Sequence, residues 1–572
     1  MRIHTGRKIV LAALATSALG TIAVPAFAQD AQSAAAEAEA SNPNEIIVSA
    51  RRRNESIQST PIAVTAIQGA QLEGAAALTI GDLQGAAPNV LITSGGTGAA
   101  AANISIRGIA FADIEKSFDP AVGVNIDGVY IGTSTGQMLD FFDIDSIEVL
   151  RGPQGTLFGR NTIAGVINIK RSRPKNEFTG KMEAEFGSYG RFSSRNVVNL
   201  PVVDDVLAAK AFYMHTESNG FYRNFGPGAS HRGGYNNENF GVSMLFTPTS
   251  NFDALITLEK QVQDFDPILG GLSRTGDAFA PFLPPAFVDN GRTDGVYDVM
   301  TPVDLLGTYR SKGATGEMNL DLGGVKLTSV TGYRESTDQL LQDYATSGLY
   351  VANRDQDYWQ FSQELRASGK LGDTFDYVAG VYYFKSKYDL EQHTSVFGAV
   401  PNVQNTTGWS ESYAGFLDVN WEVFDRVRLS GGGRYTHDKK ALQTSFVDGV
   451  NSAVNFNAPR SSKSWSKFTP KVGIDYRPTQ DLMVYASWSR GFRSGGFNGR
   501  GLTLFSASLP YDPETVDSYE VGIKSELFDR MLTVNLAGFY SDYKDIQQTS
   551  TVATPGSAAT QTVVVNAAAA KI

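Results

Sequence analysis

The glycine-rich run Gly152–Gly159 is the stretch whose residue types most suggest binding chemistry, because glycine-rich loops can cradle phosphate groups with their backbone amides. A phosphate-binding loop would continue into Gly-Lys-Ser or Gly-Lys-Thr, and neither sequence follows here. We therefore interpret the run as a tight turn. The histidines beyond residue 28 are far apart in sequence, which predicts loop or lumen residues rather than metal ligands: His215, His231, His393 and His437.

Composition excludes several other kinds of site and protein. The 572 residues include no cysteine, so disulfides, zinc thiolate sites, iron–sulfur clusters and thiol nucleophiles are excluded. A net charge of −10 argues against general nucleic-acid binding. With 42% hydrophobic residues the chain is too apolar to be disordered. Its single long apolar run lies at the N-terminus, which argues against a helical membrane protein. No catalytic residue, metal or cofactor is predicted, and the chain is not expected to be an enzyme.

The N-terminal residues have the pattern of an export signal. Arg2, Arg7 and Lys8 precede the apolar stretch Ile9–Val24, and Ala26-Phe27-Ala28 ends it. This order predicts a secretory signal peptide over residues 1–28; the alternative is a membrane anchor, for which the stretch is short. Residues 29–44 are rich in Ala, Gln and Glu and predict a flexible tail.

The elements that must position any binding residues begin with a compact, glycine-rich region from Glu45 to about Lys170, predicted to be a small α+β domain. Thr79–Ala87 is its helical candidate, and Asp127-Gly128 between two apolar runs predicts a hairpin. Its strand-like runs are Asn103–Arg107, Gly123–Ile126, Val129–Gly132, Ser146–Leu150 and Gly165–Ile169.

From about Lys175 onward, long segments alternate apolar and polar residues. Leu417 and Val419 are predicted to face lipid, and Asp418 and Asn420 to face a lumen. Short turns alternate with long loops, which is typical of an outer-membrane barrel rather than a sandwich. The short turns are predicted near Val203, Thr249, Gly323, Gly372, Phe424, Thr479 and Phe528. Candidate aromatic girdle residues are Tyr383, Trp421, Tyr435, Trp488 and Tyr540.

Several runs resemble the TonB-dependent outer-membrane receptor family, and the resemblance extends from about residue 45 to the end of the chain. Glu45-Ile46-Ile47-Val48-Ser49-Ala50 is similar to the TonB box of these receptors. Asn103–Gly108, Gly123–Tyr130, Ile144–Asn161 and Ala164–Ile169 resemble their plug domain. The resemblance implies an all-β transmembrane barrel with an N-terminal α+β plug domain, the plug over residues 51–171 and the barrel over residues 172–572.

The resemblance also implies a partner and a mechanism. The TonB box, Glu45, Ile46, Ile47, Val48, Ser49 and Ala50, would pair with the energy-transducing protein TonB, which pulls on the plug. Independently, a short β-branched run on a flexible tether can add as a strand to a partner's sheet; the alternative is that Ile46–Val48 is only the first strand of the plug. Arg107, Glu148, Arg151 and Arg160 are candidates for a buried ion network between plug and barrel, with ordinary structural pairing as the alternative.

The strand count departs from the family pattern. The family's plugged barrels close with about 22 strands, whereas the turns here indicate about 15–16, the last a partial strand at Gln561–Asn566. We therefore expect a receptor that is incomplete at its C-terminus, because an open sheet edge leaves backbone groups unpaired in lipid.

The sequence therefore predicts a receptor in the outer membrane of a Gram-negative bacterium, with outer-membrane lipid, TonB and an external ligand as partners and no nucleic acid. A ferric siderophore is the expected ligand; carbohydrate, cobalamin or an aromatic compound is the alternative within the class. A passive porin or a barrel enzyme is the alternative from another class. The plug loops Thr93–Ala102 and Ala110–Pro120 show no dedicated ligand chemistry in the sequence.

Overall fold

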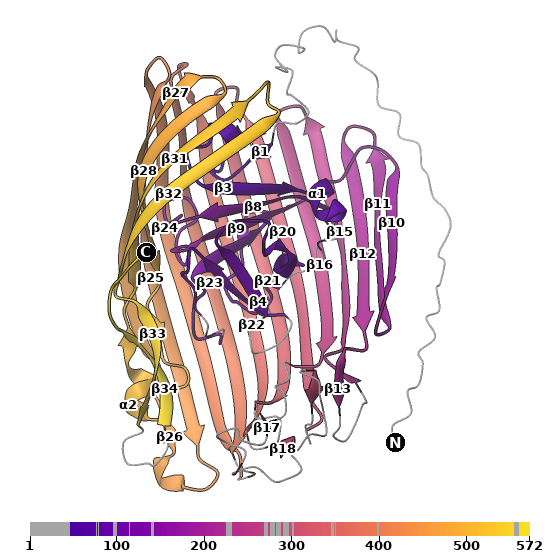
Figure 1. Ribbon diagram of the computed structural model, residues 1–572, viewed down its shortest axis with the longest axis vertical. Helices are drawn as coiled ribbons and strands as arrows, with labels where there is room; N and C mark the ends of the chain where they lie inside the picture. Colours follow the sequence, from indigo (N-terminus) through magenta and orange to yellow (C-terminus); the bar gives the residue numbers. More distant parts are fainter. Residues whose placement is uncertain are drawn as a thin grey trace. The chain divides into compact units, whose positions relative to one another are not determined.

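The computed structural model divides the chain into two compact units, residues 1–45 and residues 46–572. The structure describes residues 46–75, 77, 79–94, 100–111, 113, 115–138, 142–224, 231–267, 273–274, 281, 288–289, 297–299, 303–344, 348, 350–396, 398, 400–553 and 560–572. The predicted signal peptide, the predicted tail and Glu45 lie outside the described residues. Within the second unit, a small mixed domain is enclosed on one side by very long strands (Figure 1).

Residues 46–171, which we call the plug, contain a five-stranded sheet with the order β3-β8-β9-β6-β7. The strands are β3 (Val64–Gln68), β6 (Val122–Ile126), β7 (Val129–Tyr130), β8 (Ile144–Arg151) and β9 (Gly165–Arg171). Only the β6–β9 pair of this sheet is parallel. Fully buried apolar side chains such as Val124, Ile147 and Ile167 form its core, as expected for a sheet covered on both faces.

The remaining plug elements are short. They are β1 (Ile47–Val48), β2 (Glu55–Ser56), the 3-10 turn Ile57–Ser59, α1 (Gly69–Gly74), the 3-10 turn Ile80–Leu83, β4 (Val90–Ser94) and β5 (Ala102–Ile106). The prediction of a helix over Thr79–Ala87 is wrong in type and extent. Thr79 and Asp82 cap a single 3-10 turn, and Gly85 then adopts a φ of 89°, which ends it. The five predicted strand runs are confirmed as β5 to β9.

The predicted hairpin at Asp127-Gly128 is confirmed. Ile126 pairs with Val129 across the turn, and both turn residues have positive φ, 48° at Asp127 and 81° at Gly128. Such angles define the two-residue turn whose twist matches the flanking strands. Asp127 also accepts hydrogen bonds from the backbone amide and the guanidinium of Arg171 at 2.9 and 2.6 Å, which ties the hairpin to the end of β9.

The rest of the chain builds a 17-stranded antiparallel sheet, as far as the described residues show, which we call the wall. Its strands are β10 (Thr179–Gly187), β11 (Arg191–Val203), β12 (Leu207–Ser218), β15 (Tyr235–Thr249), β16 (Phe252–Phe265), β20 (Leu306–Asp321), β21 (Val325–Asp343), β22 (Tyr350–Leu371), β23 (Phe375–Val396), β24 (Asn402–Phe424), β25 (Val427–Val447), β26 (Phe456–Asn457), β27 (Ser461–Thr479), β28 (Leu482–Arg493), β31 (Glu514–Leu527), β32 (Leu532–Lys544) and β35 (Ala570–Lys571). Neighbours in this order are also neighbours in sequence, apart from small elements that lie in the loops.

The predicted short turns are confirmed, since each falls at the end of a wall strand. β11 ends at Val203, β15 at Thr249, β24 at Phe424 and β27 at Thr479. We call this the turn end of the wall and the opposite end the loop end. The connections at the loop end are mostly longer and carry small elements of their own (Figure 1). These are β13 (Tyr222–Asn224), β14 (His231–Arg232), β17 (Ser273–Arg274), β18 (Val288–Asp289), β19 (Asp298–Val299), the 3-10 turn Ser452–Val454, β29 (Gly496–Phe497), α2 (Leu504–Ser508), β30 (Pro510–Tyr511), β33 (Gln547–Ala553) and β34 (Thr560–Asn566).

The last predicted strand lies elsewhere than expected. Gln561–Asn566 belongs to β34, which pairs with β33 in a separate two-stranded sheet instead of extending the wall. Its partner β33 follows β32 beyond the loop end, so β34 pairs there and not with a wall strand. The chain rejoins the wall at β35, where Ala570 pairs with Tyr543.

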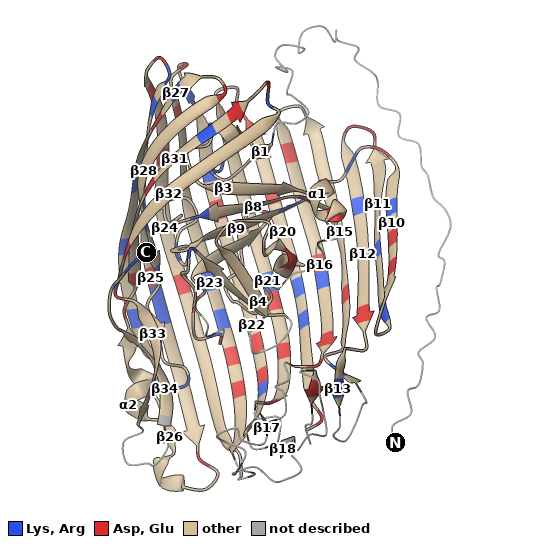
Figure 2. Cartoon of the chain, in the orientation of Figure 1, with Lys and Arg blue, Asp and Glu red and all other residues tan. Residues whose placement is uncertain are grey.

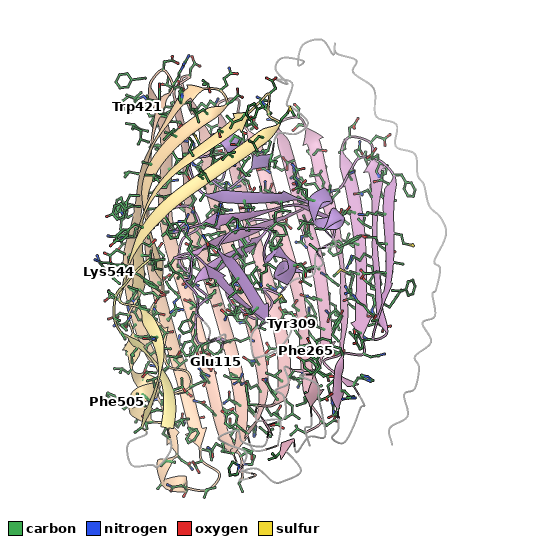
Figure 3. All side chains as sticks on the ribbon, in the orientation of Figure 1. Glu115, Phe265, Tyr309, Trp421, Phe505 and Lys544 are labelled. Carbon is green, nitrogen blue, oxygen red and sulfur yellow. The ribbon has the colours of Figure 1, made fainter. Side chains whose placement is uncertain are left out.

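Side chains alternate across the wall as the sequence predicts. On β24, Asp418 and Asn420 are buried toward the plug, whereas Leu417 is 50% exposed on the outer face. Trp421 also lies on the outer face, near the turn end (Figure 3). Tyr435 and Tyr540, two other predicted girdle residues, are likewise exposed. An apolar outer face with a polar inner face is the pattern of a sheet that contacts lipid on one side. Among the described residues, no helix is long and apolar enough to cross a bilayer.

Candidate functional site

The N-terminal segment Ile46–Ala50 is docked on the plug. Ile47 and Val48 form β1, which pairs with β2, and the side chains of Val48 and Ala50 are buried. Ser49 donates hydrogen bonds to Glu148 Oε1 from its backbone amide at 2.5 Å and from its hydroxyl at 3.0 Å. Asn168 Nδ2 donates to the other carboxylate oxygen at 3.1 Å. Glu148 is therefore the fully buried acceptor that holds this segment against β8 and β9.

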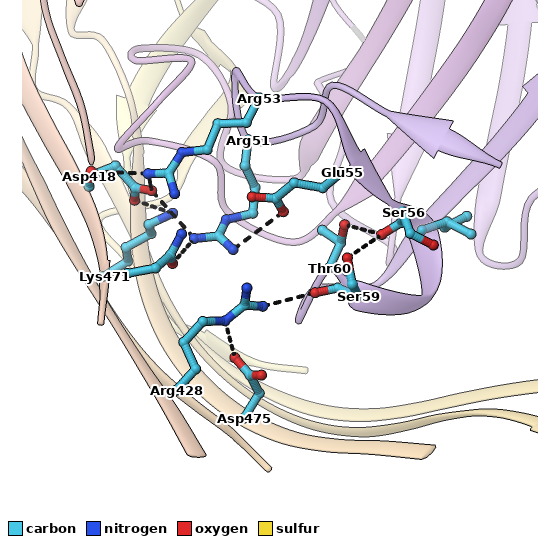
Figure 4. Close-up of polar contacts among 12 residues, drawn as sticks. Arg51, Arg53, Glu55, Ser56, Ser59, Thr60, Asp418, Arg428, Lys471 and Asp475 are labelled. Carbon is cyan, nitrogen blue, oxygen red and sulfur yellow. Dashed lines mark hydrogen bonds and ion pairs between the residues drawn. The ribbon is translucent and has the colours of Figure 1, made fainter. Parts of the chain in front are cut away.

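Two arginines that follow this segment, Arg51 and Arg53, reach the wall at one carboxylate (Figure 4). Arg53 donates to the Asp418 carboxylate at 3.1 Å, and Lys471 of β27 lies 2.5 Å from its other oxygen. Arg51 lies 3.5 Å from Asp418, donates a hydrogen bond to Asn420, and pairs with Glu55 at 3.5 Å. We call this group the Asp418 cluster. Burial lowers the pKa of Arg53 although Asp418 opposes the shift, so the carboxylate compensates the cost of burying this cation.

Two further contacts tie the same stretch of the plug to the wall. Arg52 lies 3.3 Å from Glu364 on β22. The carbonyl oxygen of Ser59 accepts hydrogen bonds from Arg428 at 2.9 Å and Arg477 at 2.8 Å. Lys524 of β31 donates to the carbonyl of Ile57 at 2.7 Å. Residues 51–59 are thus fixed by cations and anions from five wall strands, β22, β24, β25, β27 and β31.

The four predicted network residues lie at three separate contacts. Glu148 stays inside the plug, as described above. Arg107 forms an ion pair with Glu520 on β31 and stacks 4.0 Å from the ring of Phe539. Arg151 lies near the same group, where burial first and Arg107 second lower its pKa, while Glu520 opposes them. Arg160 lies on the other side of the plug, 3.6 Å from Asp438 of β25 and 2.9 Å from the Ser410 hydroxyl of β24.

The glycine-rich run Gly152–Gly159 packs against the wall. Gly152 and Gly159 adopt φ values of 87° and 85°, which other residues rarely accept. A side chain at Gly155 would meet the backbone oxygen of Arg490 at 2.7 Å. Beside it, the hydroxyls of Thr156 and Thr469 each donate to a carbonyl across the interface, at 2.9 and 3.0 Å. The run is a turn shaped for close contact with the wall.

Gly132-Thr133-Ser134-Thr135-Gly136 has the letters of the Gly-x-Ser-x-Gly nucleophile elbow, which sequence reasoning overlooked. An elbow joins a strand to a helix, whereas this segment runs from β7 into an irregular loop. Gly132 donates its amide to Gln360 of β22 at 2.9 Å, and Gly136 donates to the carbonyl of Ala100 at 2.6 Å. The segment therefore serves as a wall contact of the plug.

The plug loop between β5 and β6 lies toward the loop end of the wall, where Glu115 is labelled in Figure 3. Its charged residues all have wall or loop partners. Lys116 forms an ion pair with Asp338 of β21, and Glu115 lies 2.6 Å from Arg500 in the loop after β29. Asp119 accepts a hydrogen bond from Lys440 of β25 at 2.6 Å. These internal partners come from distant strands, so the sequence alone did not indicate them, and they leave the expectation about ligand chemistry in Ala110–Pro120 untested. Of the other loop, Thr93–Ala102, residues 95–99 lie outside the described residues.

A small cavity of about 40 Å³ lies between this plug loop and the wall. Its lining includes three cations, Lys116, Arg160 and Lys440, and one anion, Asp119. The rings of Tyr358 on β22, Tyr388 on β23 and Phe497 in the loop after β28 also line it. We call it the apical cavity. Space of this size admits a few water molecules or one polar group of a ligand. Figure 2 shows acidic and basic segments close together on the neighbouring strands β16 to β22.

Comparison with known families decides the identity of this assembly. The family model described as TonB dependent receptor-like, beta-barrel, matches residues 261–572, and the TonB-dependent Receptor Plug Domain matches residues 56–166. The chain belongs to the TonB-dependent receptor family. Its wall is the family's transmembrane β-barrel, its plug is the plug domain, and the outer membrane of a Gram-negative bacterium is its location.

Individual relatives agree with this assignment. The pesticin receptor of Yersinia pestis is 25% identical over 535 residues, which cover 93% of this chain and 74% of the relative. The ferripyoverdine receptor of Pseudomonas aeruginosa is 21% identical, over 84% of this chain and 58% of the relative. The crystal structure of the ferric yersiniabactin uptake receptor from Yersinia pestis superposes with a TM-score of 0.77 at 22% identity, covering 90% of this chain and 75% of that one.

The histidines of this TonB-dependent receptor do not gather. His215 is on the outer face of β12, His393 is near the end of β23, and His437 is on β25, where it contacts the Ser466 hydroxyl at 3.0 Å. In the part of the chain that the structure describes, no group of three potential metal-binding side chains occurs.

Proposed function

We propose that this TonB-dependent receptor imports a ferric siderophore and is a transporter rather than an enzyme. The apical cavity carries the proposal, because it presents Lys116, Arg160 and Lys440 beside the rings of Tyr358 and Tyr388. Ferric iron prefers anionic oxygen ligands, so its chelates carry carboxylate, phenolate or similar groups that such cations attract. The relatives named as receptors for ferric pyoverdine and ferric yersiniabactin support this ligand class.

We further propose that Glu45–Ala50 is the segment that TonB captures and that outer-membrane lipid surrounds the barrel. Ile47 and Val48 already form a strand edge in β1, which favours strand addition to a partner's sheet. In the docked state Val48 and Ala50 are buried, so the segment must leave β2 and Glu148 before a partner can pair with it. No nucleic-acid partner is proposed.

The ligand is tested by radioiron uptake in a strain that depends on this receptor for growth without free iron. We expect energy-dependent uptake from ferric yersiniabactin or another ferric chelate in a panel of phenolate, catecholate and carboxylate types. Lys440→Met should reduce uptake at least about tenfold, since a buried cation that contacts the ligand is lost. Lys467→Met, on the neighbouring strand outside the cavity lining, is the matched control. Uptake of cobalamin or maltodextrins with no uptake of any ferric chelate would contradict the proposal.

The coupling segment is tested separately with Ile47→Pro. Proline removes a backbone donor and cannot pair within a sheet interior, so uptake should be lost while binding of the chelate at the cell surface persists. Ile47→Val keeps the strand and should behave as the unmodified receptor. Normal uptake by Ile47→Pro would show that TonB engages another segment.

A further inference from the structure

The plug places an anion of its own in the apical cavity. The Asp119 carboxylate accepts a hydrogen bond from Lys440 Nζ at 2.6 Å, and the two side chains are only 14% and 10% exposed. Both residues line the cavity. A carboxylate of the plug therefore occupies the position at Lys440 that an external anion would need.

The cavity also contains a donor without a well-placed internal acceptor. The Tyr388 side chain of β23 is buried and lines the same cavity. Its hydroxyl makes no hydrogen bond of good geometry to a described residue, although the Ser117 side chain lies close enough to interact with it. Buried hydroxyl groups nearly always have a partner, so this position indicates where an acceptor from outside the chain binds. Unlike Lys440, Tyr388 has only a weak contact with Ser117 to exchange when it receives a ligand.

We propose that Asp119 is an internal counter-ion, which an anionic oxygen of the ligand replaces at Lys440 while Tyr388 donates a hydrogen bond to the same ligand. The proposal rests on the proposed function, because it takes the ferric chelate as that ligand. The proposal also narrows the chemical class of the ligand. The rings of Tyr358 and Phe497 flank the cations, so the ligand is an aromatic chelate with a carboxylate or phenolate near its surface.

The replacement has a mechanical consequence for the plug. Burial raises the pKa of the Asp119 carboxyl, but Lys440 and Arg160 lower it by more, so Asp119 is an anion that depends on these cations. Once Lys440 binds the ligand instead, the buried carboxylate is left with weaker compensation and favours movement toward water. Because the Asp119 carbonyl accepts a hydrogen bond from Arg493 of β28 at 3.3 Å, such movement strains a second contact between plug and wall.

The first test measures binding of a small probe to the purified receptor in detergent. The probe is the iron(III) complex of salicylate, which carries a carboxylate and a phenolate on one ring. Asp119→Asn removes the internal competitor, so the affinity for the probe should rise at least about fivefold. Lys440→Met should abolish binding, and Lys467→Met should leave it unchanged. Benzyl alcohol, a neutral ring, should bind all four proteins equally weakly.

The second test follows the plug loop itself. The chain contains no cysteine, so Ser117→Cys provides a single thiol in the loop next to Asp119. Ser117 is buried, and its modification by a maleimide should be slow in the resting receptor. The salicylate complex should raise the rate at least about fivefold, because the coupling between two linked events is reciprocal. In combination with Asp119→Asn or Lys440→Met, modification should be fast without the probe.

Either of two results would overturn the proposed exchange of Asp119 for the ligand at Lys440. One is an unchanged or lower probe affinity in Asp119→Asn; the other is slow modification of Ser117→Cys in both the Asp119→Asn and Lys440→Met backgrounds. Lys440→Met provides the second route should Asp119→Asn fail to fold. If radioiron uptake from a ferric chelate is normal while these results are negative, the exchange is wrong and the proposed function stands. If no ferric chelate is taken up at all, the proposed function itself is wrong.

Discussion

At the scale of single residues, one carboxylate of the wall, Asp418, holds the plug by pairing with several cations. Asp418 is fully buried and receives Arg51 and Arg53 from the plug and Lys471 from the wall. A buried ion group of this kind is expensive to break, because the remaining charges lose their compensation in a site that excludes water. The Asp418 cluster therefore holds the segment just after the proposed TonB box more firmly than β1–β2 pairing alone could.

Asp418→Asn tests this anchor. Three cations would lose their shared anion, so the anchored state should be destabilised by about 3–5 kcal/mol. The arginines would then become accessible, and limited digestion with trypsin should cut after Arg51, Arg52 or Arg53 much faster than in the unmodified receptor. Glu422→Gln on the exposed end of the same strand is the control. Equal digestion rates for the two variants would show that Asp418 does not hold this segment.

Glu148→Leu tests the docking of the N-terminal segment separately. The substitution keeps a side chain of similar size but removes the carboxylate that accepts hydrogen bonds from the Ser49 amide and from Asn168. An unsatisfied buried donor costs about 1–3 kcal/mol, so Ile46–Ala50 should detach more often. Ile47 is exposed, so Ile47→Cys in this cysteine-free chain provides a site for a spin label that leaves the contact between Ser49 and Glu148 intact. The mobility of the label should rise in Glu148→Leu. It should stay low in the control Glu183→Gln, which changes a glutamate of β10 in the wall.

The sequence predicted the types of these residues better than their partners. Arg107, Arg151 and Arg160 were sensible candidates for plug–wall contacts, and all three lie near wall residues. Their partners, and those of Arg51 to Arg53, are several hundred positions away, and only the register of the wall decides which carboxylate each meets. For the same reason Asp119 and Lys440 could not be paired in advance, since neither belongs to a motif.

At the scale of elements, the alternation of β24 carries the argument for a membrane-facing wall. Its outward residues Leu417 and Trp421 are exposed and apolar or aromatic, while its inward residues bind the plug. The same two-residue period sets each register in the wall, where neighbouring strands pair without interruption for up to 22 residues.

Leu417→Arg tests the outer face of β24. A charge on the lipid side near the middle of the apolar band should cost about 2–4 kcal/mol of folding free energy in lipid vesicles. Glu422→Arg, near the turn end, should cost less than about 1 kcal/mol because the side chain reaches water. Urea titration followed by tryptophan fluorescence measures both values. Equal costs at the two positions would contradict the orientation of this strand.

Element boundaries follow the sequence where local rules decide them. The Asp127-Gly128 hairpin and the short turns of the wall were predictable, because turn geometry and two-residue alternation are local. The 3-10 turn at Ile80–Leu83 and the β33–β34 sheet were not, because a glycine at positive φ and a competing strand partner decided them. A local glycine conformation overrode the pattern in the first case, and tertiary pairing did so in the second.

At the scale of the whole molecule, the plug contacts the wall along most of its length. The N-terminal segment and the Asp418 cluster lie toward the turn end, and the apical cavity lies toward the loop end. The Gly152–Gly159 run packs between them, where Thr156 and Thr469 each donate a hydrogen bond across the interface. A ligand as large as a ferric chelate cannot pass while these contacts hold, so import requires the plug to move relative to the wall.

A reversible covalent tether tests this requirement most directly. Thr156 of the plug donates its hydroxyl to the carbonyl of Thr469 at 2.9 Å, so the two residues are adjacent across the interface, and cysteine is close to threonine in size. Because the chain has no other cysteine, the Thr156→Cys/Thr469→Cys pair can be joined in only one way, by a disulfide or by a short reducible linker between the two thiols. We predict that the oxidised receptor binds ferric chelate at the cell surface but imports none, that a reductant restores uptake, and that each single variant imports in both conditions. Undiminished uptake by the fully oxidised receptor would contradict the account.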